Sequence, residues 1–399
     1  MTLISSIENL PPHLASSVSA EEAAYITQIK CRGLLPFGVT PHFASLAGPD
    51  RNDPIRRQFF PDPRELLPDP FALDDPLGEA YHRAAPRLVH QYRDRALLLA
   101  GGSCAGYCRY CFRRVWVSGG SGGGTSSGPQ GFIGDDELPP ILAYLRSHPE
   151  IREVLVSGGD PLTATDDKLD RLFRQLREAR PEVLLRVCTR APITDPARLS
   201  PDTIALFRQY RPLRMAVHIN HPRELSPEAR AGLTACVNAE IPILVQTVLL
   251  RGINDNADPL TELFQACTGL GLRPYYLFQL DLAPGTAHFR VPLKAGLALY
   301  RELQDRFREC RDSGDAGNGG AGSGGAGSGA DDGRKRHDGS GADGGSTPNG
   351  LPAYAVDLPG GGGKIRLSED VIAGIREEPG GKVYLLKGTD GRVWPYPAN

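Results

Sequence analysis

The chain has 399 residues, and its 45 Lys and Arg nearly balance its 47 Asp and Glu, which leaves a formal net charge of −2. This balance argues against a nucleic-acid partner held by bulk charge. No apolar run is long enough to span a membrane, and residues 1–20 lack the basic start and apolar core of a secretory signal. The eight cysteines do not make a disulfide scaffold, so we expect mostly reduced thiols and a cytoplasmic location.

Two stretches interrupt the globular pattern of the chain. Ser118–Gly131 and Ser313–Gly350 are rich in Gly and Ser, and neither carries enough apolar surface to offset the entropy lost on ordering. We therefore expect two flexible insertions, the second of them disordered. Together with the motifs below, they divide the chain into an N-terminal extension (1–90), a core (91–312, interrupted at 118–131), the insertion 313–350 and a C-terminal segment (351–399).

Short apolar runs alternate with amphipathic segments through the core. The runs are almost continuously apolar, as expected for strands covered on both faces. Strands are predicted at Ala96–Ala100, Glu153–Ser157, Leu184–Thr189, Arg214–Asn220, Pro242–Leu250 and Pro274–Leu280, and helices at Asp166–Ala179, Pro201–Tyr210, Ser226–Ala239 and Asp258–Leu270. Ser200 and Ser226 are predicted helix caps. The repetition predicts an α/β fold with parallel strands, which form either an open sheet or an incomplete barrel.

Polar residues gather where the predicted strands end. In chain order they are Cys104–Cys111, Ser157–Asp160, Thr189–Arg190, His218–His221, Gln246 and Asp281. Because the carboxyl ends of parallel strands meet at one edge of a sheet or barrel, we expect these residues to share one site.

Three cysteines, Cys104, Cys108 and Cys111, have the spacing C-x3-C-x2-C. Three thiolates on one tight loop can ligate three corners of a cubic iron–sulfur cluster and leave the fourth iron open to a reactant. Zinc is the alternative, but it needs a further ligand, and neither His82, His90 nor Cys188 has zinc-finger spacing. A disulfide reading is disfavoured because the number of cysteines in the run is odd.

A lysine follows four glycines in Asp357-Leu-Pro-Gly-Gly-Gly-Gly-Lys364. A phosphate loop of the G-x4-G-K-[ST] type is excluded, because Leu358 stands at its first glycine position and Ile365 follows the lysine. A flexible linker also fits poorly, since Pro359 lies inside the stretch. A lysine on a permissive loop suits a Schiff-base linkage to pyridoxal 5′-phosphate.

The cysteine run, with Tyr110 before its last cysteine, resembles the radical S-adenosylmethionine superfamily. The resemblance implies a partial (β/α)6 TIM-like barrel whose three cysteines hold a 4Fe-4S cluster, and the open iron of this cluster binds S-adenosyl-L-methionine. Ser157-Gly158-Gly159-Asp160 is similar to the glycine-rich motif of that family, where backbone approaches the methionine end of the cofactor.

Both cofactor motifs together resemble a narrower family, the lysine 2,3-aminomutases. The similarity extends from about Asp53 to Pro395, outside the two insertions. Its motifs are Pro61–Leu66, Tyr92–Arg95, Cys108–Arg114, Val156–Leu162, His218–Pro222, Gln246–Asp255, Gln279–Leu282 and Val356–Lys364. The resemblance implies an isomerase that shifts the α-amino group of L-lysine to the β-carbon, built as the barrel with an N-terminal helical extension and a C-terminal segment that binds pyridoxal 5′-phosphate.

The resemblance also implies roles for single residues at the substrate. Lys364 matches the catalytic lysine that carries pyridoxal 5′-phosphate. Arg113 matches the arginine that pairs with the substrate carboxylate, a task that suits a planar guanidinium. Asp281 and Asp357 match two aspartates that hold the far ammonium of lysine, which favours a basic substrate.

Further residues are implied as cofactor contacts. Tyr92 and Arg95 lie where the family contacts pyridoxal 5′-phosphate, although Gln91 stands in place of a usual arginine. The remaining contacts, to S-adenosyl-L-methionine, are Gly158, Gly159, Asp160, His218 and Gln246. Some relatives bind a structural zinc through C-terminal cysteines; no cysteine follows Cys310, so we expect no such zinc.

Two other functions remain open from the sequence. One is an aminomutase that acts on a lysine of elongation factor P, and the other is a non-catalytic iron–sulfur or zinc protein whose Gly-rich insertions mediate interactions. For the enzyme we expect a reducing electron donor such as flavodoxin or ferredoxin, with no nucleic-acid or membrane partner. The sequence also allows a homo-oligomer.

Overall fold

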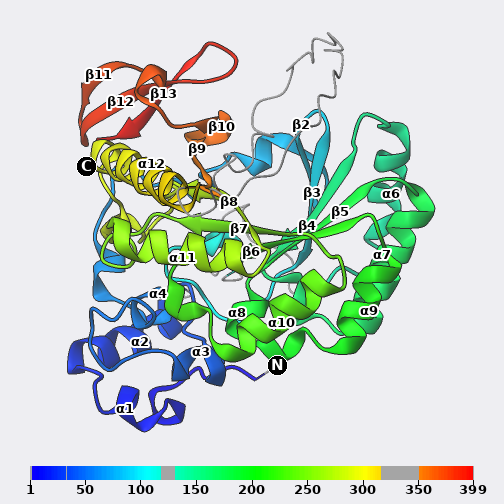
Figure 1. Cartoon of the computed structure of the whole chain (residues 1–399), viewed down its shortest axis with the longest axis horizontal. Helices are drawn as coiled ribbons and strands as arrows, with labels where there is room; N and C mark the ends of the chain where they lie inside the picture. The colour runs from blue at the N-terminus through cyan, green and yellow to red at the C-terminus, as the bar shows by residue number, and fades with distance from the viewer. Residues whose placement is uncertain (1, 33, 118–130, 316–349, 399) are drawn as a thin grey trace.

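One ten-stranded sheet organises the molecule. The computed structural model describes residues 2–32, 34–117, 131–315 and 350–398, and the strands of this sheet follow one another from β1 to β10 in sequence order (Figure 1). Strands β3 to β8 pair in parallel. They span Arg95–Gly101, Glu153–Gly158, Leu184–Thr189, Leu213–His218, Ile243–Val248 and Arg273–Phe278. Each overlaps its predicted range, so the six predicted strands are confirmed.

Helices cover the outer face of these parallel strands (Figure 1). The crossover helices are α6 (Leu138–Ser147), α7 (Asp166–Ala179), α9 (Pro201–Gln209), α10 (Pro227–Asn238), α11 (Ala257–Gly269) and α12 (Leu293–Asp315). On α7, Leu172 and Phe173 belong to the predicted apolar stripe and are buried against the sheet. The hydroxyls of Ser200 and Ser226 accept hydrogen bonds from the first turns of α9 and α10, which confirms both caps. Six strand–helix repeats thus form the expected partial barrel.

The C-terminal segment completes the parallel part of the sheet. Strand β9 (Ala353–Leu358) pairs in parallel with β8, and β10 (Gly363–Arg366) turns back antiparallel to β9. A seventh parallel strand therefore comes from beyond the second insertion. The remaining strands, β11 (Ile372–Glu378), β12 (Gly381–Lys387) and β13 (Val393–Pro397), form a separate antiparallel sheet.

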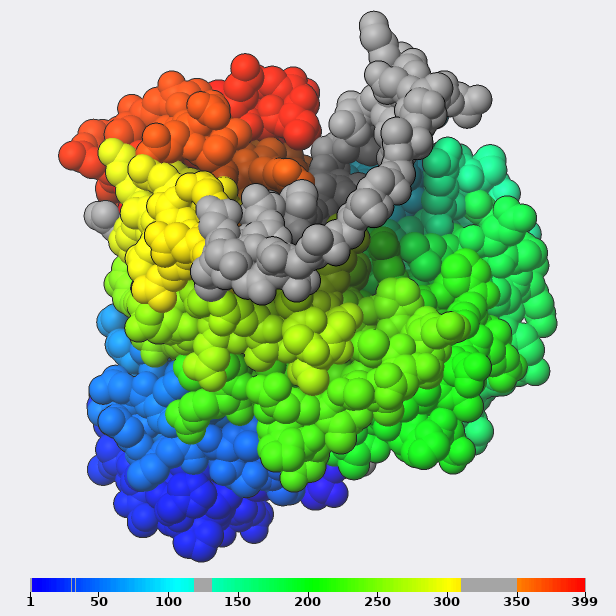
Figure 2. Space-filling view, in the orientation of Figure 1, coloured from blue at the N-terminus to red at the C-terminus, as the bar shows by residue number. Residues whose placement is uncertain are grey.

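The N-terminal extension combines short helices with two strands. Its helices are α1 (Pro12–Ala15), α2 (Ala20–Arg32), α3 (Pro41–Ser45) and α4 (Arg56–Phe59). Strand β2 (Leu88–Tyr92) pairs antiparallel with β3, and β1 (Arg83–Ala85) pairs antiparallel with β2. The extension thus contains the expected helices, and its last residues add two strands, in which the buried Leu88 and Val89 pair with Leu98 and Leu97 of β3. Figure 2 shows the extension, in blue, packed on the barrel.

The insertions predicted at Ser118–Gly131 and Ser313–Gly350 fall almost entirely outside the described residues. Helix α12 continues to Asp315, three residues into the second predicted insertion. A helix gains one hydrogen bond for each residue added, so its end need not coincide with the change in composition. Within the described ranges, no helix is both long and apolar enough to cross a bilayer.

Candidate active site

A cavity of about 340 Å³ opens at the carboxyl ends of the parallel strands. The residues to which the family resemblance gives a role all line this cavity: Tyr92, Arg95, Cys104, Cys108, Cys111, Arg113, Gly158, Gly159, Asp160, His218, Gln246, Asp281, Asp357 and Lys364. Asn220 and His221, also expected at the site from the end of the fourth strand, do not line it. The two antiparallel flanks contribute Tyr92 from β2 and Lys364 from β10. The chain thus brings the two cofactor motifs to one space although they lie at opposite ends of the sheet.

The cysteine loop is held by the N-terminal extension. The backbone N–H of Tyr107 donates to Gly38 O at 2.9 Å, and that of Arg109 donates to Gln58 O at 2.9 Å. The Arg109 guanidinium is buried and donates to both carboxylate oxygens of Glu65, and Arg114 shares Oε2 in an ion pair at 2.5 Å. The residues that follow Cys108 and Cys111 are therefore anchored from outside the barrel.

Two of the three thiols, those of Cys104 and Cys111, favour their protonated form before metal binds. Burial, followed by the neighbouring cysteines, raises the pKa of Cys104 well above its usual value, and burial raises the pKa of Cys111 to about 11. Metal binding must displace these protons. In the described part of the chain, no three His, Cys, Asp or Glu side chains surround a point where a single ion fits. The three-thiolate pattern of the loop is what favours a cluster over a single zinc ion.

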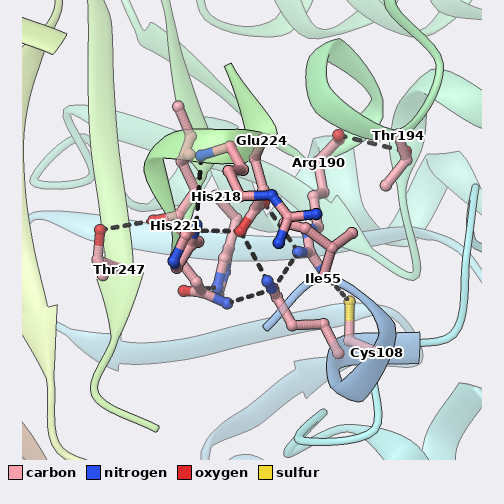
Figure 3. Close-up of polar contacts among 12 residues, drawn as sticks. Ile55, Cys108, Arg190, Thr194, His218, His221, Glu224 and Thr247 are labelled. Carbon is pink, nitrogen blue, oxygen red and sulfur yellow. Dashed lines mark hydrogen bonds and ion pairs between the residues drawn. The ribbon is translucent and has the colours of Figure 1, made fainter. Parts of the chain in front are cut away.

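A buried polar network backs the loop on the side of Cys108 (Figure 3). Arg190 donates through Nη1 to Cys108 Sγ at 2.8 Å and through Nη2 to Glu224 Oε2 at 3.0 Å. The His218 ring lies 3.0 Å from Asn220 Oδ1. Burial, and then the Arg190 charge, lowers the pKa of His218 to about 3, so this ring is neutral at physiological pH. The network therefore presents one positive charge to the cysteine sulfur.

Sequence reasoning found only part of this network. The sequence predicts Arg190 and His218 at the site because they lie at the ends of predicted strands, whereas Gln58 and Glu224 belong to no pattern that marks them as site residues. Gln58 Oε1 accepts from Arg190 at 2.5 Å, and Gln58 Nε2 donates to Glu224 at 2.9 Å. Glu224 is fully buried. The one signal available was a charged residue, Glu224, inside the predicted loop after the fourth strand.

The glycine motif packs directly on the cysteine loop. A Cβ added to Gly158 would lie 2.3 Å from Gly101 O, and one added to Gly159 would lie 2.2 Å from Ser103 O. Gly158 also has φ of 121°, which disfavours any other residue. The Asp160 carboxylate accepts hydrogen bonds from the Leu162, Arg190 and Ala191 backbones and from the Thr189 hydroxyl. Asp160 therefore ties the loops after β4 and β5 together.

Lys364 lies directly opposite Asp357 across β9 and β10. Its Nζ is 2.5 Å from Asp357 Oδ2 and 4.1 Å from the centre of the Phe278 ring. The Tyr92 hydroxyl accepts a hydrogen bond from the Lys364 backbone N–H at 2.9 Å. Gly360, Gly361 and Gly363 have φ of 67°, 95° and 78°, so the turn before the lysine requires glycine at these positions.

The two aspartates form an acidic pole near Lys364. Burial and repulsion from Asp357 raise the pKa of Asp281 well above its ordinary value, although Lys364 and Arg113 oppose the shift. On the neighbouring wall, Arg95 is fixed by Asp94 through bonds of 2.9 Å. Gln91 donates to Gly361 O at 3.2 Å, so it contacts the glycine turn.

Arg113 forms a cationic pole in the same cavity, and it already has a partner. Its Nε lies 3.1 Å from each carboxylate oxygen of Glu79, and its Nη2 lies 2.5 Å from Oε1. Burial disfavours the charged guanidinium, but Glu79, together with Cys111 and Cys188, outweighs burial and raises the pKa of Arg113. Sequence reasoning missed Glu79, which lies in an irregular segment without a motif.

Comparison with known proteins gives the family. No family model matches the sequence. The chain is 40% identical over 348 residues to the putative L-lysine 2,3-aminomutase of Treponema pallidum, which covers 86% of this chain and 83% of that protein. It is 33% identical over 302 residues to the L-lysine 2,3-aminomutase of Clostridium subterminale, covering 75% and 70%.

A third relative, the L-lysine 2,3-aminomutase of Escherichia coli, is 38% identical over 254 residues, covering 63% of this chain and 71% of that protein. Among solved structures, "Native anSMEcpe with bound AdoMet" gives a TM-score of 0.42 at 13% identity over 55% of this chain and 61% of that chain, a likeness too slight to bear on the assignment. On the strength of its relatives, the chain belongs to the lysine 2,3-aminomutase family of radical S-adenosylmethionine isomerases, whose cofactors are a 4Fe-4S cluster, S-adenosyl-L-methionine and pyridoxal 5′-phosphate.

Proposed function

We propose that this chain converts free L-lysine to β-lysine, with Lys364 as the anchor of pyridoxal 5′-phosphate and the three cysteines of the loop as cluster ligands. One observation carries the proposal, the arrangement of charge in a single cavity. Arg113 supplies a cation, while Asp281 and Asp357 supply carboxylates beside the Lys364 amine. Lysine has the complementary pattern, since its carboxylate and its far ammonium lie at opposite ends of the molecule.

The acidic pole supports a basic substrate over an acidic one. A glutamate side chain would bring a third carboxylate next to Asp281 and Asp357, and repulsion between like charges is strong in a partly dry cavity. A lysine side chain brings an ammonium to the same place. Lys364 Nζ already pairs with Asp357 at 2.5 Å, which supports this carboxylate as a partner for a primary ammonium.

The surroundings of Lys364 suit pyridoxal 5′-phosphate. The amine lies over the rings of Phe278 and Tyr276 at 4.1 and 5.3 Å, and the glycine turn lets a flat ligand approach the backbone. When bound, this cofactor supplies a conjugated π system that lets an amino group migrate, and the cluster with S-adenosyl-L-methionine supplies the radical. If Lys364 held pyridoxal 5′-phosphate through its amine, that amine would no longer neutralise Asp357, and the carboxylate would be open to the substrate ammonium.

Turnover by reconstituted protein tests the proposal. Protein loaded anaerobically with iron, sulfide, pyridoxal 5′-phosphate and S-adenosyl-L-methionine, then reduced, should convert L-lysine to β-lysine. Lys364→Ala should lose the pyridoxal absorbance and at least about 1,000-fold in kcat, because the anchor of an essential cofactor is removed. Lys382→Ala is the matched control, because Lys382 is exposed and forms a surface ion pair with Glu377 at 3.6 Å.

Three outcomes of that test would contradict the proposal. Full turnover by Lys364→Ala would remove the role given to the lysine. Turnover of a lysine in elongation factor P, without turnover of free lysine, would identify the protein substrate instead. A loaded protein that forms neither 5′-deoxyadenosine nor β-lysine would leave a non-catalytic metal protein.

The proposed reaction also requires an electron donor and a reducing compartment. Cleavage of S-adenosyl-L-methionine requires one electron, which we assign to a low-potential donor of the flavodoxin or ferredoxin type. We infer a cytoplasmic location from the reduced cysteines, because an oxygen-sensitive cluster also requires a reducing compartment. A homo-oligomer is compatible with this function, and light scattering of the loaded protein measures its oligomeric state directly.

A further inference from the structure

The contact between Arg113 and Glu79 uses only one edge of the guanidinium. Glu79 takes the edge formed by Nε and Nη2. Within the described residues, the one acceptor recorded for Nη1 is the Ser157 hydroxyl at 3.4 Å, which is a long hydrogen bond. A guanidinium offers two bidentate edges, so the edge that contains Nη1 remains suited to a second carboxylate.

Glu79 is itself held in place. Its side chain is 15% exposed and that of Arg113 is 14% exposed, so the pair is largely screened from water. The Asp75 carboxylate accepts hydrogen bonds from the backbone N–H groups of Glu79 and Ala80 at 3.0 and 2.8 Å. This capping fixes the start of the short 3-10 helix Glu79–His82 and therefore the direction of the Glu79 side chain.

The segment that carries Glu79 is docked on the glycine turn before Lys364. The Gly360 N–H donates to Pro76 O at 2.8 Å. Gly78 has φ of 65°, and a Cβ added there would lie 2.6 Å from the Gly361 nitrogen. Only glycine permits this approach, so residues 75–79 connect the Arg113 pole to the turn that holds Lys364.

We propose that Glu79 is a positioning residue that clamps Arg113 by one edge so that the other edge receives the substrate carboxylate, and that the docked segment 75–79 sets the separation between this receptor and Lys364. The inference rests on the proposed function and deepens it. It identifies a specificity determinant for α-carboxylates that does not itself touch the substrate. It also predicts an effect opposite to simple Coulomb attraction, since removal of a negative charge next to Arg113 should weaken binding of an anion.

Binding to the cofactor-loaded protein tests the clamp without turnover. Glu79→Gln keeps the shape of the side chain and removes its charge. We expect the Kd of L-lysine to rise about 10- to 100-fold, the range of a charge-assisted contact. Binding of 1,5-diaminopentane, which has both amines of lysine and no carboxylate, should not change. In an Arg113→Lys background, Glu79→Gln should add little, because both substitutions remove one coupled interaction.

Two further variants separate the clamp from general stability. Glu377→Gln, at an exposed pair with Lys382, should leave both Kd values unchanged. Gly78→Ala retains Glu79 but forces its segment off Gly361, and it should weaken lysine binding selectively in the same way. Unchanged lysine affinity in Gly78→Ala would remove the role of the docked segment.

The outcomes distinguish this inference from the proposed function. Equal or tighter lysine binding by Glu79→Gln would overturn the clamp while the proposed function stands, and so would equal losses for lysine and 1,5-diaminopentane. Loaded wild-type protein that does not bind lysine would overturn the proposed function and the inference together.

Discussion

At Asp281, burial and the neighbouring charge of Asp357 both disfavour the ionised carboxylate. Burial first, and repulsion from Asp357 second, raise its pKa well above the ordinary value for an aspartate. In the empty site the carboxyl therefore keeps its proton at a pH where a surface aspartate is ionised. An arriving ammonium favours the ionised form, so binding below this raised pKa must release the proton.

We predict that lysine affinity rises with pH, by up to about tenfold per pH unit for one released proton, and levels off above the raised pKa of Asp281. Calorimetry in two buffers of different ionisation enthalpy counts the protons released. Asp281→Asn should remove the component of this pH dependence that comes from Asp281. His218, with its pKa near 3, does not contribute in this range.

The outcome that opposes this prediction is proton uptake on lysine binding. An unchanged pH dependence in Asp281→Asn would also exclude Asp281 as its source. Gln246→Glu would be a poor control because Gln246 lines the cavity. Asp390→Asn, which replaces a carboxylate on an exposed turn, is the matched comparison.

At the scale of elements, the strand ends position the cysteine loop through close backbone contact. The N–H of Gly159 donates to Gly101 O at 2.6 Å, and the N–H of Asp160 donates to Ser103 O at 2.7 Å. These two hydrogen bonds thus fix the loop that leads from β3 to Cys104 against the end of β4. The glycine motif accordingly shapes the loop that we propose as the cluster site.

We predict that Gly159→Ala destabilises the fold by about 1–3 kcal/mol, because its new Cβ would lie 2.2 Å from Ser103 O and backbone must move. The reconstituted variant should also hold less iron and sulfide per chain, since the displaced backbone leads into Cys104. Thermal unfolding and metal analysis measure the two effects.

Gly269→Ala is the control for this substitution. A Cβ at Gly269, the last residue of α11, meets nothing within 4 Å, so stability should change by no more than about 0.5 kcal/mol. Full cluster content in Gly159→Ala would show that the loop tolerates the displacement.

At the scale of the whole molecule, the N-terminal extension anchors the cysteine loop. Glu65, buried in the extension, pairs with Arg109 and Arg114 on either side of Cys111. The Asp62 side chain caps the short helix that contains Glu65. One carboxylate thus joins the extension to the cluster loop through two buried cations.

We predict that Glu65→Gln destabilises the protein by about 3–5 kcal/mol, because two guanidiniums lose their shared carboxylate in a buried place. The cluster should also be lost more readily, since both cations flank Cys111. A lower melting temperature and faster loss of iron to a chelator measure these effects.

Glu369→Gln is the control for Glu65→Gln. Its side chain is 70% exposed and pairs with Arg301 at the surface, so the free energy of unfolding should change by no more than about 0.5 kcal/mol. Equal melting temperatures for the two variants would mean that the extension is not secured through Glu65.

Local patterns were sufficient for much of this protein. The predicted range of α7 agrees with the structure at both ends, because its apolar stripe repeats within a few residues. The three cysteines and the glycine–lysine turn are also short-range signals, and each motif restricts the cofactor by its own chemistry. Element order and the repeating β/α pattern therefore follow from neighbouring positions in the chain, whereas the roles of Arg113, Asp281 and Asp357 were implied only by the family resemblance.

Contacts between distant segments had no such signal. Glu79 on Arg113, Gln58 on Arg190 and Glu65 on Arg109 join residues far apart in sequence, and none has a spacing that marks it. Strand β9 and the pairing of Lys364 with Asp357 likewise appear only once the C-terminal segment returns to β8. Periodicity and motifs record what adjacent residues do, whereas the partner of a buried charge is set by which surfaces meet when the chain folds.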